Sequence, residues 1–162
     1  MRTALLFMVL AVALLAPVQH SGAQQPPTTW VAWLSGADQV PRNASTATGF
    51  ASFQVNAART AIDYWLFVNG IQNVQMAHIH TGAAGQNGPV AIWLYPAAPP
   101  AVLIPGAVSG YIGQGTITER NFGGPLQGRR MADVLGMMSS GTLYVNVHTT
   151  AFPGGEIRGQ VQ

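Results

Sequence analysis

Histidine is the residue of this chain whose type and spacing could do chemistry. Three of the four histidines, His78, His80 and His148, fall inside two short motifs, Ala-His-Ile-His and Val-Asn-Val-His-Thr. The fourth, His20, lies near the N-terminus. Imidazole is the commonest metal ligand in proteins, and its charge changes near neutral pH. The clustering therefore predicts that His78, His80 and His148 serve one site.

Both motifs have the alternation of a β-strand, in which successive side chains point to opposite faces. His78 and His80 then share one face, with Cα atoms about 6.6 Å apart. In the second motif, His148 shares its face with Tyr144 and Asn146. The opposite face is apolar and consists of Leu143, Val145 and Val147.

If these strands are neighbours in one sheet, the three imidazoles can converge on one ion. Imidazole nitrogens bind metals at ~2.0–2.1 Å. A three-nitrogen site with an open position favours copper or zinc. Cysteine is absent, which excludes thiolate ligands. The sulfur atoms of Met131, Met137 and Met138 are expected to pack in the core rather than bind metal.

A last strand-like run places Glu156, Arg158 and Gln160 on one polar face. We expect Glu156 or Asn146 to hold a histidine ring N–H and fix its tautomer, with Tyr144 and Gln160 beside them around the ion. Arg158 is expected to steer a small anion or to pair with Glu156. The alternative interpretation is that this His/Asn/Glu/Arg network is purely structural and only joins three strands.

The motifs belong to a series of β-rich runs separated by glycine, proline and asparagine. Short strands spaced in this way predict an all-β fold, either a sandwich or a barrel. The tryptophans all lie within such runs and are predicted to be mostly core residues. The runs are Trp30–Leu34, Gly49–Val55, Ala61–Val68, Ala77–His80, Pro89–Leu94, Tyr111–Ile117, Thr142–Thr149 and Glu156–Val161.

One segment, near 129–138, has the apolar spacing of a helix and predicts one short helix. Its apolar residues are Met131, Val134, Leu135 and Met138. The proline-rich segment Pro96–Pro105 is predicted to be an apolar loop. The glycines between Thr81 and Pro89 are predicted to form a tight loop rather than a phosphate-binding loop, because no strand–loop–helix context surrounds them.

The N-terminus has the features of a secretory signal peptide. Arg2 precedes the apolar run Ala4–Ala16, and Ser21–Ala23 offers small residues for cleavage. The expected division is a signal peptide over 1–23, a flexible lead-in over 24–29 and one domain over 30–162. The protein is then exported, to the periplasm, the medium or the cell surface. The alternative interpretation is that the segment stays attached as an uncleaved N-terminal anchor. No later run reaches the ~20 apolar residues of a membrane span.

The charge content limits the expected partners. Seven arginines and no lysine face five acidic residues, for a net charge of +2. No basic run follows that could track a phosphate backbone, so nucleic acid is not an expected partner. A metal ion or a small anion is the partner that the histidine and arginine motifs predict.

Four motifs of this chain strongly resemble the CHRD domain, which is named after chordin. They are Ala-His-Ile-His-Thr-Gly at 77–82, Asn-Gly-Pro-Val at 87–90, Leu-Tyr-Val-Asn-Val-His-Thr at 143–149 and Gly-Gly-Glu-Ile-Arg-Gly-Gln at 154–160. The opening segment Leu34–Pro41 is similar as well. The resemblance spans about 31–162, and it implies a single exported domain without assigning it a reaction.

A weaker resemblance is to the copper/zinc superoxide dismutases. Their fold is an antiparallel Greek-key β-sandwich, and the resemblance implies such an immunoglobulin-like or superoxide-dismutase-like sandwich for this chain. That fold also carries a His-x-His strand, a later strand histidine and an arginine after a glycine-rich turn. His78, His80, His148 and Arg158 occur here in the same order. The chain departs from that family because no histidine remains for a bridging ligand, no zinc loop is recognisable and no disulfide can form.

Two functions follow from these observations. The first is an exported protein that binds copper or zinc through three histidines. If it is an enzyme, the second resemblance implies a copper-dependent redox activity of superoxide-dismutase type. The second is a non-enzymatic extracellular binding or structural module. Hydrolase chemistry lacks a recognisable nucleophile and base.

Overall fold

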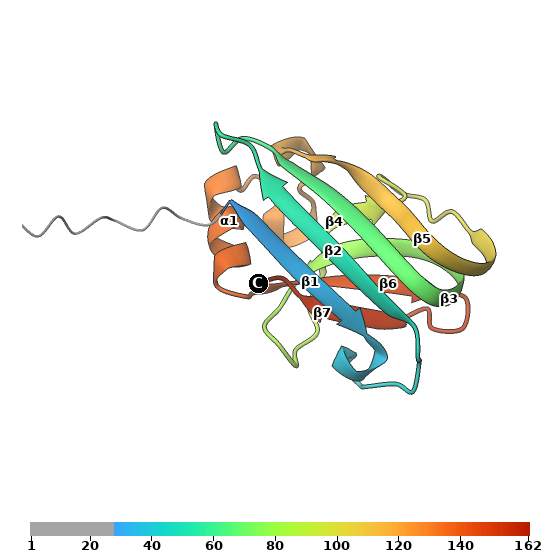
Figure 1. Cartoon of the computed structure of the whole chain (residues 1–162). Helices are drawn as coiled ribbons and strands as arrows, with labels where there is room; N and C mark the ends of the chain where they lie inside the picture. The colour runs from blue at the N-terminus through green and yellow to red at the C-terminus, as the bar shows by residue number, and fades with distance from the viewer. Residues whose placement is uncertain (1–27) are drawn as a thin grey trace, which may run out of the picture.

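The computed structural model describes residues 28–162 as an antiparallel β-structure with one short α-helix (Figure 1). This confirms the predicted all-β class. The expected signal peptide, residues 1–23, lies outside the described residues, and Thr29 of the expected lead-in is already in the first strand. The strands are β1 (Thr29–Ser35), β2 (Thr48–Val55), β3 (Ile62–Thr81), β4 (Val90–Tyr95), β5 (Ile104–Ile117), β6 (Leu143–Thr149) and β7 (Ile157–Gln160).

The strand β3 is twenty residues long and belongs to both layers of the sandwich. Its first part pairs with β2 and β5, and its last part pairs with β6 and β4. Between them, Gly70 and Asn73 have φ values of 67° and 52°, and the register with β5 shifts there. The predicted strands Ala61–Val68 and Ala77–His80 are therefore two parts of one strand. The intervening segment continues it because Ile71 and Val74 are buried.

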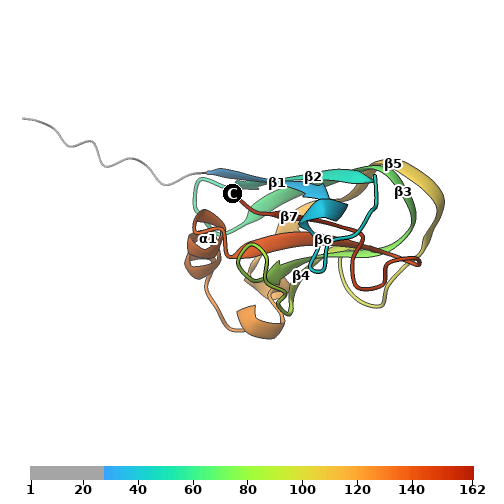
Figure 2. The same ribbon diagram turned by 90° about the horizontal axis from the view of Figure 1, so that it is seen from below.

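Two four-stranded layers result, which Figure 2 shows from the side. The front layer of Figure 1 has the order β1-β2-β3-β5, and the rear layer has the order β7-β6-β3-β4. β6 returns to lie beside β3 on the side away from β4, which is a Greek-key connection. The apolar core fills the space between the layers, with Leu66, Val145 and Ile157 completely buried.

The helix α1 (Met131–Ser139) covers one end of the sandwich (Figure 1). It confirms the helix predicted near 129–138, and the four apolar residues that predicted it are its buried residues. The Glu119 carboxylate accepts the Met131 backbone N–H at 2.7 Å, and Asp133 accepts that of Arg130 at 3.1 Å. Negative charge at a helix N-terminus is favourable, so these carboxylates help to begin the helix at this point.

The prediction that the tryptophans are mostly core residues is wrong for two of them. Trp30 is buried, but Trp33 and Trp65 are exposed on the outer face of the front layer. Strand alternation accounts for this, since Ala32 and Leu34 take the inward positions of β1. The predicted loop Pro96–Pro105 is also shorter than expected, because β5 begins at Ile104.

Candidate metal centre

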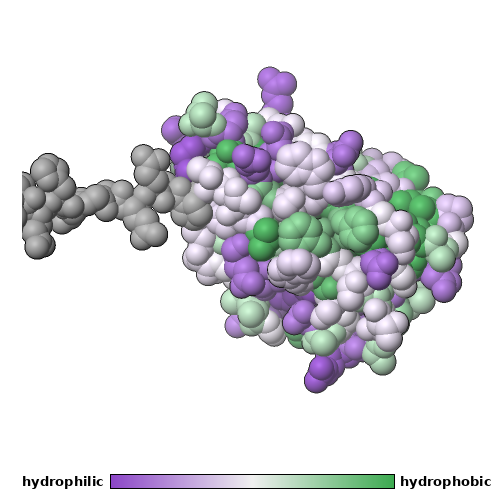
Figure 3. Space-filling model, in the orientation of Figure 1, coloured by the Kyte–Doolittle hydropathy of each residue, from purple (hydrophilic) through white to green (hydrophobic). Residues whose placement is uncertain are grey.

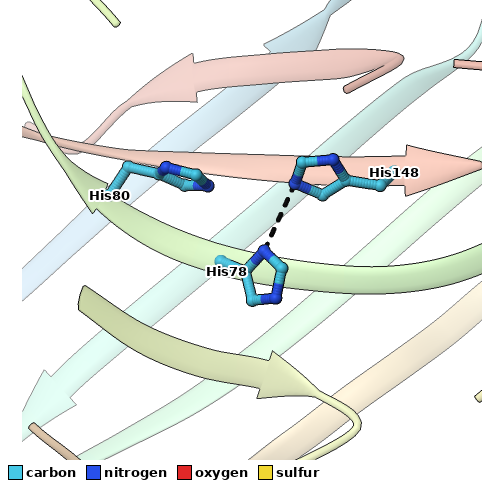
Figure 4. Close-up of side chains that lie close together, drawn as sticks. All are labelled: His78, His80 and His148. Atoms are coloured by element: carbon cyan, nitrogen blue, oxygen red, sulfur yellow. Dashed lines mark hydrogen bonds between the residues drawn. The ribbon is translucent and has the colours of Figure 1, made fainter. Parts of the chain in front are cut away.

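The three histidines lie on neighbouring strands of the rear layer. β3 pairs with β6 and β6 pairs with β7, as the site prediction required. His78 is in register with Asn146, and His80 is in register with Tyr144, while His148 lies opposite Met76. Strand alternation points all three imidazoles away from the core, toward one side of the layer (Figure 4).

This outer face of the rear layer is covered, although its residues are polar. Every residue of β6 is buried, and so are His78, His80 and Arg158. Segments from three connections form the cover. They are the segment after β1, which includes Gln39, the loop 82–89 between β3 and β4, and the turn 150–156 between β6 and β7.

The imidazole nitrogens converge. His78 Nδ1 lies 3.3 Å from His148 Nε2, the contact marked in Figure 4. One nitrogen from each of His78, His80 and His148 lies within 4.8 Å of the corresponding nitrogens of the other two. The ring centroids are 5.0 to 6.0 Å apart. The predicted cluster is therefore present as a compact group of three nitrogens.

Backbone carbonyls orient two of the rings. His80 Nδ1 lies 2.9 Å from the Gly88 carbonyl oxygen, and His148 Nδ1 lies 2.9 Å from the Pro153 carbonyl oxygen. A carbonyl only accepts, so each Nδ1 carries the hydrogen and donates it. Each Nε2 then presents its lone pair to the cluster. Carbonyls take the place that we predicted for Asn146 or Glu156, because the covering loops bring backbone closer to the rings than those side chains.

Two of the imidazole nitrogens have no hydrogen-bond partner within residues 28–162. They are His78 Nε2 and His80 Nε2, both buried. A buried polar atom without a partner costs about 1–3 kcal/mol. Such atoms are rare in folded proteins, and a bound water, a bound ion or a catalytic role can account for them. The lone pair of His80 Nε2 is thus available to a ligand.

Burial keeps the imidazoles neutral. Desolvation is the largest cause that lowers the pKa of His78, to about 3, and the charges of His148 and His80 lower it further. Desolvation likewise lowers the pKa of His80 to about 4, against the raising effect of its bond to Gly88. The pKa of His148 is also lowered by burial. Neutral imidazole is the form that binds metal ions, so the site is ready to bind at neutral pH.

The polar residues predicted to surround the ion hold the cover instead of the rings. Asn146 Oδ1 accepts a hydrogen bond from Gln39 Nε2 at 2.7 Å. The Glu156 carboxylate accepts from the hydroxyls of Ser45 and Thr149, both at 2.7 Å. Gln160 Nε2 donates to the carbonyls of Gly82 and Gly141, at 2.8 and 2.7 Å. Each of these side chains ties a loop to the rear layer.

Arg158 ties the loop 82–89 to the rear layer through hydrogen bonds. Its Nη1 donates to Asn87 Oδ1 at 3.1 Å, and its Nη2 donates to the carbonyls of Ala83 and Gln86 at 3.3 and 2.8 Å. The predicted pairing with Glu156 is wrong, because the guanidinium points toward the loop and Glu156 toward hydroxyls. Only 2% of Arg158 is exposed, which does not suit the predicted role of steering an anion from solvent.

Tyr144 connects Arg158 to the cluster. The imidazole of His80 stacks on the Tyr144 ring, with centroids 4.9 Å apart and planes 12° apart. The Arg158 Cζ atom lies 3.5 Å from the centroid of the Tyr144 ring. A guanidinium over an aromatic face is a favourable cation–π contact. Tyr144 was predicted among the residues around the ion, and it contacts a candidate ligand directly.

The sequence did not point to two other parts of the site. Trp93 contacts His78 edge to face, with centroids 4.3 Å apart. Gly88 supplies the carbonyl for His80, and a Cβ at this position would collide with the Thr81 carbonyl. Trp93 lies in β4, and Gly88 lies just before it. The pairing of β4 with β3 is non-local and could not be predicted from either histidine motif. In the sequence, only the glycine-rich composition of the loop indicates that its backbone lies close to β3.

The fold and site define an antiparallel β-sandwich with a covered cluster of three histidines. The family model of the CHRD domain matches residues 30–161. The chain therefore belongs to the CHRD domain family, as its motifs predicted. A search of curated proteins found no match, and neither did a search of solved structures. The likeness to copper/zinc superoxide dismutases thus stays a resemblance of motifs. Within the described residues, no helix is long and apolar enough to cross a membrane.

Proposed function

We propose that this CHRD domain binds one copper or zinc ion through His78, His80 and His148. The observation that carries the proposal is the convergence of three buried, neutral imidazoles, one of which presents a ring nitrogen that has no other partner. A cluster held together only by its own hydrogen bonds would be expected to pair these nitrogens. A bound ion would satisfy His80 Nε2, whereas His78 would bind through Nδ1 and keep its hydrogen on Nε2.

The spacing of the nitrogens suits such an ion. With bonds of about 2.05 Å to each nitrogen, the 3.3 Å between His78 Nδ1 and His148 Nε2 corresponds to an angle of about 107° at the metal, close to tetrahedral. Two such bonds span at most about 4.2 Å. Any pair of nitrogens near the 4.8 Å limit would therefore have to approach by at least about 0.6 Å on binding, and by about 1.5 Å to reach a tetrahedral angle at the ion.

The donor set restricts the ion. Three imidazoles and no thiolate or carboxylate favour copper or zinc over magnesium or calcium, which prefer oxygen. A fourth position would remain open toward the cover. Because the loop 82–89 covers the rings, we propose ion binding rather than rapid turnover of a substrate. The protein would be exported, with residues 1–23 as its signal peptide.

Elemental analysis and titration test the proposal. Protein purified from its native compartment without added metal is expected to contain about one copper or zinc per chain. Titration of metal-free protein with Cu(II) and Zn(II) should show one tight site that is lost in H80A and H148A. E156Q serves as the matched control, because the Glu156 carboxylate is buried nearby but accepts hydrogen bonds from the hydroxyls of Ser45 and Thr149 rather than from the rings. Stoichiometric binding that survives in H148A would contradict the proposal.

A purely structural network is the second candidate function. The direct contact of His78 with His148, and the stack of Arg158, Tyr144 and His80, join three strands without any ion. On this interpretation the domain is a non-enzymatic extracellular module. H78A would then lower the melting temperature equally in the presence and absence of metal. Under the metal proposal, the loss is larger when metal is present.

A further inference from the structure

A row of aromatic side chains crosses the outer face of the front layer, far from the histidines. Trp33 in β1 is in register with Phe50 in β2, Phe50 with Phe67 in β3, and Phe67 with Tyr111 in β5. Trp65 lies on the same face, two residues before Phe67. We call these five residues the aromatic ladder. Its rings touch across the strands, with centroids 4.6 Å apart for Trp33 and Phe50 and 5.6 Å apart for Phe67 and Tyr111.

The aromatic ladder is open to solvent. Trp33 is 66% exposed and Tyr111 is 69% exposed, with Trp65 and Phe67 at 39% and 36%. At roughly 150–250 Å² for each aromatic side chain, the exposed area is on the order of 400–500 Å². Figure 3 shows this face, with green and near-white surface across its middle and purple toward its margins. Patches of this size on soluble monomers are often interaction sites.

The shape of the aromatic ladder favours a protein partner. The planes of Trp33 and Phe50 are tilted by 50°, and those of Phe67 and Tyr111 by 81°. Rings that lie level with one another would form a flat platform. Tilted rings instead form ridges and gaps, and sheet faces that pack together interdigitate their side chains in this way.

The charge of this face favours a second copy of the chain. Asp63 is the one charged residue in β1, β2, β5 and the first part of β3, and its carboxylate accepts the Thr116 hydroxyl at 2.6 Å. A charged partner would find no complementary groups here. Two identical copies would meet with almost no repulsion between like charges, which otherwise costs several kcal/mol at an interface.

We propose that the aromatic ladder is the interface of a symmetric dimer of this chain. A twofold axis along the strands between β2 and β3 would place Trp33 of one copy opposite Tyr111 of the other, and Phe50 opposite Phe67. A stable interface buries about 800 Å² on each partner, of which the aromatic ladder supplies about half. The rim would include Ser52 and Gln114, which are in register with Trp65, the apolar Val31, which is in register with Ser52, and Gln54, two residues beyond Ser52 in β2.

Sedimentation velocity over a dilution series tests the dimer. The purified protein is expected to sediment as a dimer that dissociates on dilution. Phe67→Asp should weaken association on the order of 10–100-fold, because it buries a charge at the centre of the interface. Leu103→Asp is the matched control: Leu103 is 51% exposed but lies outside the aromatic ladder, and its variant should dimerise normally.

Tyr111→Ser is the second variant, chosen because a residue so exposed is least needed for folding. It should also weaken association while circular dichroism stays unchanged. A chain that is monomeric at every concentration would overturn the proposal, as would equal behaviour of Phe67→Asp and Leu103→Asp. So would a monomer that binds an insoluble polysaccharide and loses that binding in Tyr111→Ser, since the face would then recognise glycan.

Discussion

The two layers of the sandwich carry outer faces of opposite character, although β3 contributes to both. The rear face holds histidines, an asparagine and an arginine, yet loops bury it. The front face holds tryptophan, phenylalanine and tyrosine, yet solvent reaches it. Side-chain polarity alone would predict the reverse. The difference teaches that the connections between strands decide burial on the outer faces, while strand alternation decides only which side a residue takes.

Acidification should show the largest difference between the two faces, because only the covered face carries histidines whose protonation changes the free energy of unfolding. The pKa values of His78 and His80, about 3 and about 4, lie below the ordinary value of 6.5. The unfolded chain therefore binds protons first, and stability that is complete above pH 6.5 is lost as the pH falls toward 4. Between pH 7 and pH 5 the loss is about 2 kcal/mol for each imidazole that stays neutral.

Chemical denaturation of metal-free protein at a series of pH values measures this loss. The H80N variant should show a shallower pH dependence, because its unfolded chain has one proton fewer to bind. A free energy of unfolding that stays constant from pH 7 to pH 5 would contradict the buried, neutral state of the imidazoles.

Removal of the arginine under the covering loop should have the next largest effect. Arg158→Ala leaves the carbonyls of Ala83 and Gln86 and the face of Tyr144 without their partner. We expect a loss of about 3 kcal/mol in the free energy of unfolding. Arg42→Ala, at an exposed position, should change it by less than about 0.5 kcal/mol and serves as the control. Equal losses would show that Arg158 does not hold the cover.

Added metal should raise the free energy of unfolding only through the histidines of the covered face. An ion at about 100 times its dissociation constant raises the free energy of unfolding by about 2.7 kcal/mol if it binds only the folded state. Thermal unfolding with and without Zn(II) should show this gain in the original protein and in Trp33→Ser, but not in H80A. A gain that persists in H80A would point to binding elsewhere.

Two tryptophan substitutions give the smallest expected effect and the sharpest contrast. In dilute solution, Trp33→Ser should change the free energy of unfolding by less than about 0.5 kcal/mol, because most of its side chain is solvated. Trp93→Ser, beside His78 on the covered side, should cost at least about 2 kcal/mol. Urea denaturation compares them directly, and similar losses would remove the distinction between the faces.

Most of the fold and the histidine cluster could be predicted from the sequence. Alternation in the histidine motifs correctly put His78, His80 and His148 on one side of neighbouring strands, and helical spacing located α1. These features depend on local periodicity, which short runs express directly. The continuity of β3 was missed because Asn69 and Gly70 have the composition of a turn, and only the burial of Ile71 beyond them shows that the strand goes on.

The partners of the histidine rings could not be predicted in the same way. His80 and His148 are oriented by carbonyls of Gly88 and Pro153, and every residue has a carbonyl, so composition carries no signal for it. Arg158 was misjudged for a related reason. Its partner atoms belong to a loop about seventy residues earlier in the chain, and only the packed structure brings them together.

The hydrogen bonds from Arg158 and Gln160 to the loop 82–89 have a kinetic consequence. An ion bound to the three histidines could leave only when part of the cover opens, because the rings are buried beneath this loop, the segment after β1 and the turn 150–156. The rate of exchange would then be set by the frequency of local opening rather than by the strength of the metal–nitrogen bonds. The ion would then dissociate more slowly than the binding affinity alone would predict, so the protein would retain it even where free metal is scarce.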